Sequence, residues 1–560
     1  MASQPASVEG SRDVPFVDSD IKGLDHPVLS DGSKPNFETY LYHAQRQREK
    51  EVAESKSYDM ETGFWAKILF GNQTEKQLVA TANNEKIGDG ASISDEEYRS
   101  ASGALRTASW GGVFYLITTD ILGPYSTPWA FSQVGYGPGV ACFVVFAVMA
   151  AYSGLLLWYM FLKLDSDRYP LRSFGDLGYR IYGPWFRHVC NILQGLQLLF
   201  TVCIVILQNG QGLSQMTKFK LCFSVCNVIW TLAGMLFGQI RTLKKFGSVA
   251  NFAIWLNIIT LVMTMGTVAH TAPNYQAAEA VGVPYGPVQT VALRNQPFVP
   301  QLNGIMQIVY SYGGSMIFIE FMAEMRRPMD FWKAMAFAQL FITIVYMFFG
   351  LFVYSYQGQF VINPANQGIS LYSLQTATNA ISLTAGVIAG ALYGNIGVKV
   401  IYYTIFVELL GAPPLTVKSG KYMFAISVII YWSLAFTISS SVPQFSNVSS
   451  LVASVCVFQF SYTFPPFMIL GYVMQRTALS GDKPYNVNNP HDSRVDSWRD
   501  WSRWTRALSK YTMFNLWNFI IAIACMTGAV LASYASIKSI ITAFHDGHST
   551  SSFSCRSPVQ

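Results

Sequence analysis

Charged residues are scarce in this sequence. Asp, Glu, Lys and Arg make up 12% of the 560 residues, and hydrophobic residues make up 51%. An ordinary soluble domain is about 25% charged, so the composition excludes a wholly soluble protein and indicates a lipid environment. The shortage is uneven, because residues 1–105 are polar and mixed in charge, and no membrane-length apolar run begins before Arg106.

The sequence also lacks the motifs of several other protein classes. No metal cluster, nucleophile elbow or phosphate loop lies in the apolar runs, so we expect neither an enzyme nor a bound cofactor. No histidine lies deep in a run, which excludes a histidine proton relay. The cysteine spacing implies no disulfide framework: seven cysteines lie in or near apolar runs, and Cys222 and Cys226 are interpreted as packing residues, leaving Cys555 in the C-terminal tail.

Long apolar runs fill the rest of the chain. A helix needs about 20 apolar residues to cross a hydrocarbon core. We therefore expect an all-α integral membrane protein with a largely disordered cytoplasmic tail (1–105), a transporter domain (106–536) and a C-terminal tail (537–560). Eleven transmembrane helices are predicted at about residues 107–133, 138–162, 187–215, 221–239, 247–270, 303–325, 334–356, 380–410, 422–441, 444–474 and 512–535.

The distribution of Lys and Arg predicts the orientation in the membrane. Connections that follow even-numbered spans are rich in basic residues, as between Lys163 and Arg187. By the positive-inside rule the N-terminus is cytosolic and the C-terminus lies outside, in a multi-pass protein that we assign to the plasma membrane. This bias accounts for the formal charge of +6, so no nucleic acid partner is expected.

The first and sixth predicted spans are interrupted near their middles. The stretch TTDILGPYSTPW (118–129) contains Gly123–Pro124, and VYSYGGSMIF (309–318) contains Gly313–Gly314. If residues 107–270 and 303–474 are two halves, both breaks fall in the first helix of a half. Matched interruptions of this kind predict a five-plus-five inverted-repeat fold with a binding site at the midplane. The alternative is that both are kinks in packed helices.

A helix broken inside lipid leaves unpaired backbone groups that need a partner. Pro124 suits the first position of an outer half-helix, whose amides and positive dipole end would face a carboxylate. Carbonyl groups at the ends of the inner half-helices would accept hydrogen bonds from an ammonium group. The sequence therefore predicts an amino acid site made by Ile121, Leu122, Gly123, Pro124, Tyr125, Tyr310, Ser311, Tyr312, Gly313 and Gly314.

Three ionisable residues lie within the predicted spans: Asp120, Glu320 and Lys399. A charge at the centre of a membrane helix costs about 2.5–3.5 kcal/mol, so such groups generally face a partner or a cavity. We expect Asp120 and Lys399 to lie close together, and we assign proton coupling to Asp120 or Glu320. The alternatives are that Lys399 snorkels towards the cytosol, that Asp120 caps the inner half-helix or pairs with the backbone, and that Glu320 acts as a gate.

A further acid follows at the cytoplasmic end of the sixth span. Glu324 lies four residues after Glu320, on the same helix face. Arg326 and Arg327 come directly afterwards. We expect these three residues to form a cytoplasmic ion network that acts in gating.

At these residues the sequence resembles the amino acid/auxin permease family, and more closely its fungal branch of neutral amino acid permeases. The resemblance is carried by RTASWGGVFYLITTDILGPYSTPWAF (106–131), SFGDLGYRIYGPW (173–185) and SYGGSMIFIEFMAEMRRPMDFWKA (311–334). It implies eleven helices in the inverted-repeat fold and proton-driven uptake of neutral aliphatic and aromatic amino acids. Animal relatives often use sodium, held partly by hydroxyls on the first and eighth helices. Here Lys399 puts a fixed ammonium on the eighth helix, which argues against sodium.

The resulting hypothesis is a proton-coupled symporter that takes up neutral amino acids by alternating access. Its partners are the amino acid substrate, the lipid bilayer and regulatory proteins on the N-terminal tail. Two alternatives remain open at this point: an amino acid sensor that signals through the tail without net transport, and a sodium-coupled transporter.

Overall fold

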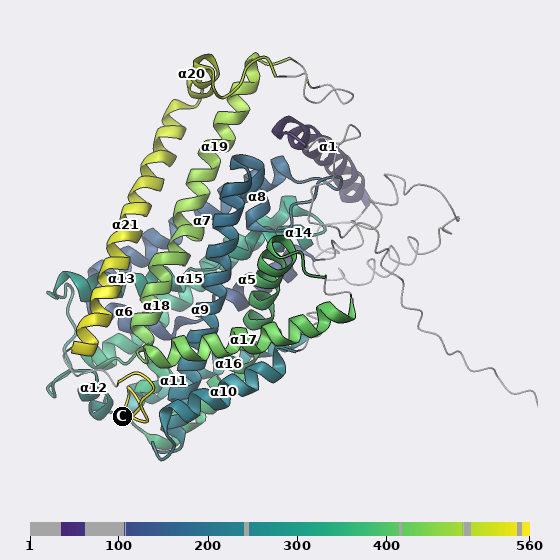
Figure 1. Cartoon of the computed structure of the whole chain (residues 1–560). Helices are drawn as coiled ribbons and strands as arrows, with labels where there is room; N and C mark the ends of the chain where they lie inside the picture. The colour runs from purple at the N-terminus through teal and green to yellow at the C-terminus, as the bar shows by residue number, and fades with distance from the viewer. Residues whose placement is uncertain are drawn as a thin grey trace, which may run out of the picture.

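The computed structural model describes residues 35–61, 106, 108–239, 246–413, 417–483, 485, 494–545 and 551–560. Within these ranges the chain is helical, with a single β-bridge between Ala108 and Met325. Among the described residues, eight helical runs are long and apolar enough to cross a membrane, so the chain is a multi-pass membrane protein. Figure 1 shows how these helices are arranged. They are α7 (Tyr136–Leu164), α9 (Pro184–Met216), α11 (Phe246–His270), α15 (Phe331–Gln357), α16 (Tyr372–Ile401), α17 (Lys418–Ser441), the run from α18 (Phe445–Val452) to α19 (Phe464–Ala478), and α21 (Thr512–His545).

The other three predicted spans have different forms. Residues 221–239 contain the short apolar helix α10 (Phe223–Phe237). Residues 107–133 contain α5 (Trp110–Ile121), the turn η1 (Pro124–Ser126) and α6 (Thr127–Val134). Residues 303–325 are covered by α13 (Phe298–Ser311), the turn η3 (Ser315–Ile317) and α14 (Phe318–Glu324).

Local backbone chemistry ends the helices at both glycine sites. After Leu122, whose N–H donates to the Thr118 carbonyl at 2.9 Å, the chain reaches Gly123 and then Pro124, which has no N–H to continue the ladder. At the end of α13, the N–H of Gly313 donates to the Tyr310 carbonyl at 3.2 Å. This bond spans three residues instead of four, a tightening that is common where an α-helix ends.

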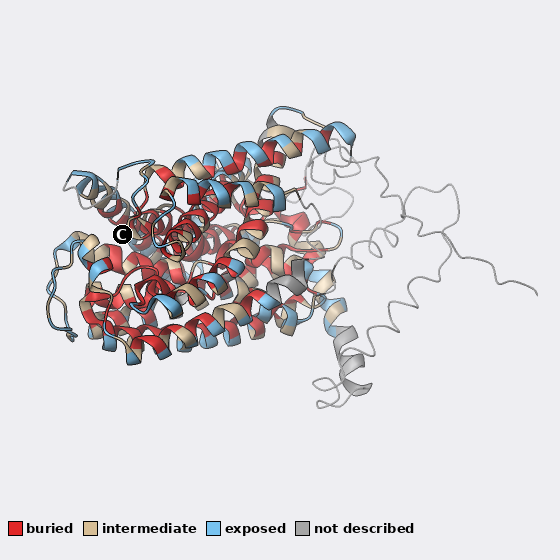
Figure 2. Ribbon diagram, turned by 90° about the horizontal axis from the view of Figure 1, so that it is seen from below, coloured by how far each residue is buried: buried red, intermediate tan, exposed pale blue. Residues whose placement is uncertain are grey.

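The helices pack around α9, which contacts α8 (Phe174–Tyr182), α10, α16 and α17. In a second group of contacts, α15 packs against α5, α6 and α7. Buried residues fill the interior, and exposed residues follow the outer helix faces (Figure 2). On α15 the exposed residues include Leu340, Ile344 and Phe348, which share one face by their spacing and suit contact with lipid.

The N-terminal region contains an unexpected helix. Residues 37–61 form α1, and its buried Phe37, Tyr40 and Ala44 pack against the rest of the protein. The guanidinium of Arg180 lies 4.4 Å from the centre of the Tyr40 ring. Disorder was therefore the wrong prediction for this segment. Apolar residues at Phe37, Tyr40, Leu41 and Ala44 form a narrow helical stripe that the polar composition of the whole tail conceals.

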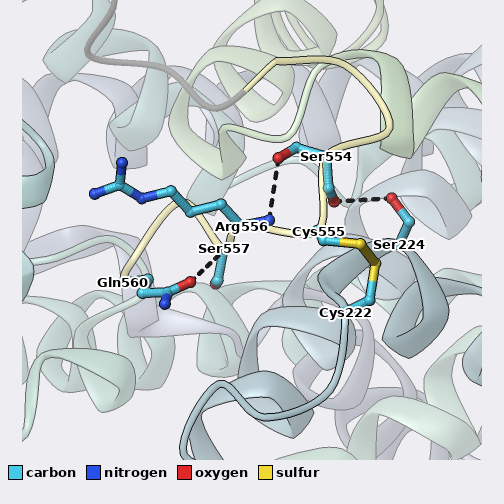
Figure 3. Close-up of a disulfide and its surroundings, with 7 residues drawn as sticks. All are labelled: Cys222, Ser224, Ser554, Cys555, Arg556, Ser557 and Gln560. Atoms are coloured by element: carbon cyan, nitrogen blue, oxygen red, sulfur yellow. Dashed lines mark hydrogen bonds between the residues drawn. A yellow bond between two sulfur atoms is a disulfide. The ribbon is translucent and has the colours of Figure 1, made fainter.

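The C-terminal tail is covalently attached to α10. Cys222, immediately before α10, forms a disulfide with Cys555, and Ser224 Oγ donates to the Ser554 carbonyl at 2.9 Å (Figure 3). The expectation of no disulfide is thus wrong. The two cysteines are 333 residues apart in the sequence, so local spacing carries no sign of their pairing. The tail also binds α17, where the N–H of Phe553 donates to the Ser440 carbonyl at 2.9 Å.

Candidate functional site

The two helix breaks lie side by side at Tyr346 of α15. The Tyr346 hydroxyl is hydrogen-bonded to the carbonyl of Ile121 and lies 2.9 Å from the carbonyl oxygen of Ser311. The N–H of Gly123 donates to the same hydroxyl at 3.3 Å. A phenol has a single hydrogen, so it can donate fully to only one of the two carbonyls at a time. The last carbonyls of α5 and α13 therefore converge on one oxygen atom, whose single hydrogen cannot serve both fully.

Tyr346 belongs to a polar stripe on α15 that sequence reasoning missed. Gln339, Thr343 and Tyr346 are spaced by four and three residues, so they share one helix face. The Tyr312 hydroxyl donates to Thr343 Oγ1 at 3.3 Å, and the Tyr312 and Tyr346 rings meet edge to face at 5.6 Å. The spacing was a usable signal, because three polar residues on one face of an apolar helix need a polar neighbour.

The surroundings of the two glycine breaks differ. Gly123 is exposed although Ile121 and Tyr125 beside it are buried, and a Cβ added there would meet no described atom within 4 Å. A Cβ on Gly313 would lie 2.9 Å from Val457 Cγ1. The first break therefore borders open space, and the second lets two helices approach closely.

The remaining predicted binding residues have varied surroundings. The Tyr125 hydroxyl donates to Asn257 Oδ1 on α11 at 3.0 Å, so this side chain is directed to α11. The Ser311 hydroxyl donates within α13 to the Gln307 carbonyl at 2.8 Å. Leu122 and Gly314 are buried, Tyr310 is half-buried, and the side chain of Pro124 lies outside the described residues.

The tenth predicted span widens where it passes the second break. Between α18 and α19 the chain forms two π-helical segments, η8 (Ala453–Val457) and η9 (Gln459–Thr463). Such turns are rare and often occur at functional sites. In this part of the described chain, the buried oxygens of Gln459 Oε1, Ser461 Oγ and Tyr462 Oη have no hydrogen-bond partner. Buried polar atoms of this kind need water or a ligand to satisfy them.

Comparison with known proteins identifies the family. Residues 106–478 match the family model described as "Transmembrane amino acid transporter protein", which is the amino acid/auxin permease family. The chain belongs to this family. The resemblance inferred from the sequence is thereby confirmed, and amino acid transport is the activity that the family supports.

Two fungal relatives illustrate the similarity. The transporter is 21% identical over 498 residues to the "N amino acid transport system protein" of Neurospora crassa, covering 85% of this chain and 95% of the relative. It is 22% identical over 429 residues to a "Transmembrane transporter" of Gibberella moniliformis, covering 73% of this chain and 87% of the relative. Among solved structures, a nucleobase-cation-symport-1 family transporter in a closed conformation has a TM-score of 0.45 and 13% identity, covering 80% of this chain and 96% of that one.

Glu320 of the transporter points into the helix bundle. Gln194 Nε2 on α9 donates to Glu320 Oε1 at 3.0 Å. The second oxygen, Oε2, is buried and makes no well-formed hydrogen bond with the described part of the chain. A carboxylate in this position is incompletely compensated, and a proton on it would relieve the imbalance.

Among the described residues, the ion network expected after Glu320 is not formed at Glu324 or Arg326, and the part assigned to Arg327 stays a prediction. Glu324 and Arg326 are exposed and make no ion pair there, while Arg327 is half-buried. The connection is made by backbone instead: the N–H of Ala108 donates to the Glu324 carbonyl, and the N–H of Arg326 donates to the Ala108 carbonyl, both at 3.0 Å. This bridge joins the chain just before α5 to the end of α14.

The other two intramembrane charges are on α5 and α16. The side chain of Asp120 lies outside the described residues, and Lys399 is half-buried in the last turn of α16. Their proximity stays a prediction.

A buried acid anchors the start of α5. Asp165, at the end of α7, is fully buried and is bound by Arg106 at 2.9 Å and by Arg48 of α1 at 3.0 Å. The N–H of Leu171 also donates to it, at 3.0 Å. Burial alone would lower the pKa of Arg106, but the charge and hydrogen bonds of Asp165, with smaller effects of Asp167 and Glu51, raise it overall. This cluster connects the start of α5 to the end of α7 and to α1, and the backbone bridge connects it to the end of α14.

Proposed function

We propose that the transporter takes up neutral amino acids with protons by alternating access. The observation that carries the proposal is the convergence of the Ile121 and Ser311 carbonyls on the Tyr346 hydroxyl. Carbonyls at helix C-terminal ends have partial negative charge, and an α-ammonium has three hydrogens to donate. In our proposal the ammonium donates a hydrogen bond to one of these carbonyls, and the Tyr346 hydroxyl donates to the other.

The substrate carboxylate is assigned to the open side of the first break. Open space surrounds Gly123, and α6 begins shortly afterwards with its positive dipole end. A neutral side chain suits the aromatic rings nearby. The centre of the Phe143 ring lies 6.2 Å from that of Tyr312 and 6.5 Å from that of Tyr346. A charged side chain would lose its hydration without a partner at these rings.

We further propose eleven spans in a five-plus-five inverted repeat. The eight long apolar helices, α10 and the two interrupted runs α5–α6 and α13–α14 add up to this number. Each interrupted run would open one half, as the matched breaks in the sequence suggest.

We assign the N-terminus to the cytosol and the C-terminus to the outside, at the plasma membrane. The distribution of basic residues supports this orientation. So does the Cys222–Cys555 disulfide, because disulfides persist in oxidising compartments. The C-terminus and α1 lie near opposite ends of the helix bundle (Figure 1), as two different compartments require.

Glu320 is our candidate for the coupling proton site, with Asp120 as the second acid. Protonation of Glu320 removes a buried charge from α14, so α14 can move relative to α9 at lower cost. Loss of the proton to the cytosol would restore the starting state. The proposed coupling ion is H⁺, and no bound cofactor is proposed.

Uptake into proteoliposomes with and without an imposed pH gradient tests this proposal. The wild type should accumulate neutral amino acids only with the gradient. Glu320→Gln should abolish accumulation while leaving exchange of labelled for unlabelled amino acid, since exchange needs no net proton movement. Glu324→Gln is the matched control, because its exposed side chain should be dispensable. Equal accumulation by the wild type with and without the gradient would contradict proton coupling.

A further inference from the structure

A cavity separates α1 from two of the long apolar helices. Its volume is about 440 Å³, and it lies between α1 and the ends of α7 and α19. Leu41, Arg48 and Val52 line the α1 side, and their spacing of seven and four residues places them on one helix face. Leu162, Lys163 and Arg476 line the other side.

The cavity has cationic groups with unused hydrogen-bond donors. Arg476 donates one hydrogen bond, to the Tyr159 hydroxyl at 2.8 Å, and Lys163 Nζ lies 5.9 Å from the centre of the same ring. Neither cation forms an ion pair with the described residues. Arg48 is already bound to Glu51 and Asp165, but its Nε is buried and has no described partner. Glu49 is the one acidic residue among the described residues that line the cavity, and it is exposed. Positive charge therefore predominates in the cavity.

The position of these cations corresponds to the lipid headgroup region. Lys163 lies in the last turn of α7 and Arg476 in the last turn of α19, and both helices belong to long apolar runs. Basic residues at the ends of membrane helices lie at the level of the headgroups, and basic pockets between such helices suit anionic headgroups. The apolar side chains of Leu41 and Leu162 line the same cavity. Apolar side chains would contribute little to binding a small soluble anion, whereas they would contact the acyl chains of a lipid.

We propose that this cavity binds the headgroup of an anionic phospholipid from the leaflet next to α1. Lys163 and Arg476 hold the phosphate, and the start of the acyl chains contacts Leu162 and Leu41. Because Arg48 and Leu41 belong to α1, the bound lipid also attaches α1 to the bundle. The site goes beyond the transport proposal, and the two can fail separately.

Lipid binding to the purified full-length protein tests the proposal. Native mass spectrometry would measure the affinity for dioctanoyl phosphatidylserine and dioctanoyl phosphatidylcholine, with inorganic phosphate as competitor. The serine lipid should bind more tightly than the choline lipid, and phosphate at equal concentration should not displace it. The double variant Lys163→Gln/Arg476→Gln should weaken binding by about 25-fold, about fivefold for each cation.

The control removes the same charge from the same side of the protein. Arg46→Gln/Arg499→Gln affects two exposed residues that do not line the cavity, and it should change the affinity less than about twofold. The charge-retaining variant Lys163→Arg/Arg476→Lys should keep most of the binding, which separates loss of the site from misfolding. Equal weakening by both glutamine double variants, equal binding of the two lipids, or displacement by inorganic phosphate would each overturn the proposal.

Discussion

Asp165 offers the sharpest test of how α1 and the first interrupted span are held. The substitution Asp165→Asn keeps the volume of the side chain and its ability to accept from Leu171 N–H. It removes the charge that faces Arg48 and Arg106, whose side chains are only 12% and 9% exposed. Both guanidinium groups would then remain buried with less compensation.

The size of the destabilisation follows from the distances between Asp165 and the two arginines. At about 3 Å and an effective dielectric constant of about 20, one such pair is attracted by about 5.5 kcal/mol. Desolvation of the three groups offsets much of this attraction, and breaking a buried pair by removing one partner typically costs about 3–5 kcal/mol. We expect Asp165→Asn to lower the free energy of unfolding by this amount.

Asp167 is the matched control. It lies two residues further along the chain, is 30% exposed and faces Arg106 at 4.0 Å. Asp167→Asn should cost less than about 1 kcal/mol, because exposed and distant pairs contribute little.

Thermal unfolding of the purified full-length variants, followed by tryptophan fluorescence, measures the difference. Asp165→Asn should lower the unfolding temperature clearly, and limited proteolysis should cleave near α1 more rapidly than in the wild type. If the two variants unfolded at the same temperature, the buried cluster could not be what anchors α1 and the start of α5.

Three further substitutions test other parts of the structure. Tyr346→Phe removes the hydroxyl shared by the two breaks and should raise the KM for uptake about fivefold, the equivalent of one hydrogen bond of about 1 kcal/mol. Gly313→Ala should lower the unfolding temperature through about 1–3 kcal/mol of overpacking, since its Cβ would lie 2.9 Å from Val457. Cys555→Ser should destabilise the protein by about 2–5 kcal/mol, measured by thermal unfolding without reductant.

Each of these substitutions has a control in the same chain. Tyr356→Phe changes an exposed tyrosine on the same helix and should leave KM unchanged. Gly123→Ala adds a methyl group next to open space and should affect stability less than Gly313→Ala. Cys142→Ser changes a half-buried free cysteine and should not mimic the loss of the disulfide. A control that behaves like its partner would refute the corresponding argument.

Features that depend on neighbouring residues could be predicted from the sequence. The apolar runs predicted the positions of the eight long helices, because membrane crossing depends on local length and hydropathy. Gly123 and Pro124 predicted the end of α5, because a proline cannot continue the backbone ladder. The same local reasoning failed for α1. Its short apolar stripe is stable as part of a helix because it packs against the core of the protein.

Contacts between distant groups depend on how the helices pack. Tyr346 is 225 residues from Ile121, Asp165 is 117 residues from Arg48, and Cys222 is 333 residues from Cys555. Each of these residues is unremarkable within its own segment, as a tyrosine in an apolar helix or an acid after a span. Their roles arise because helix packing brings buried polar groups together, and such groups are stable only when they satisfy one another.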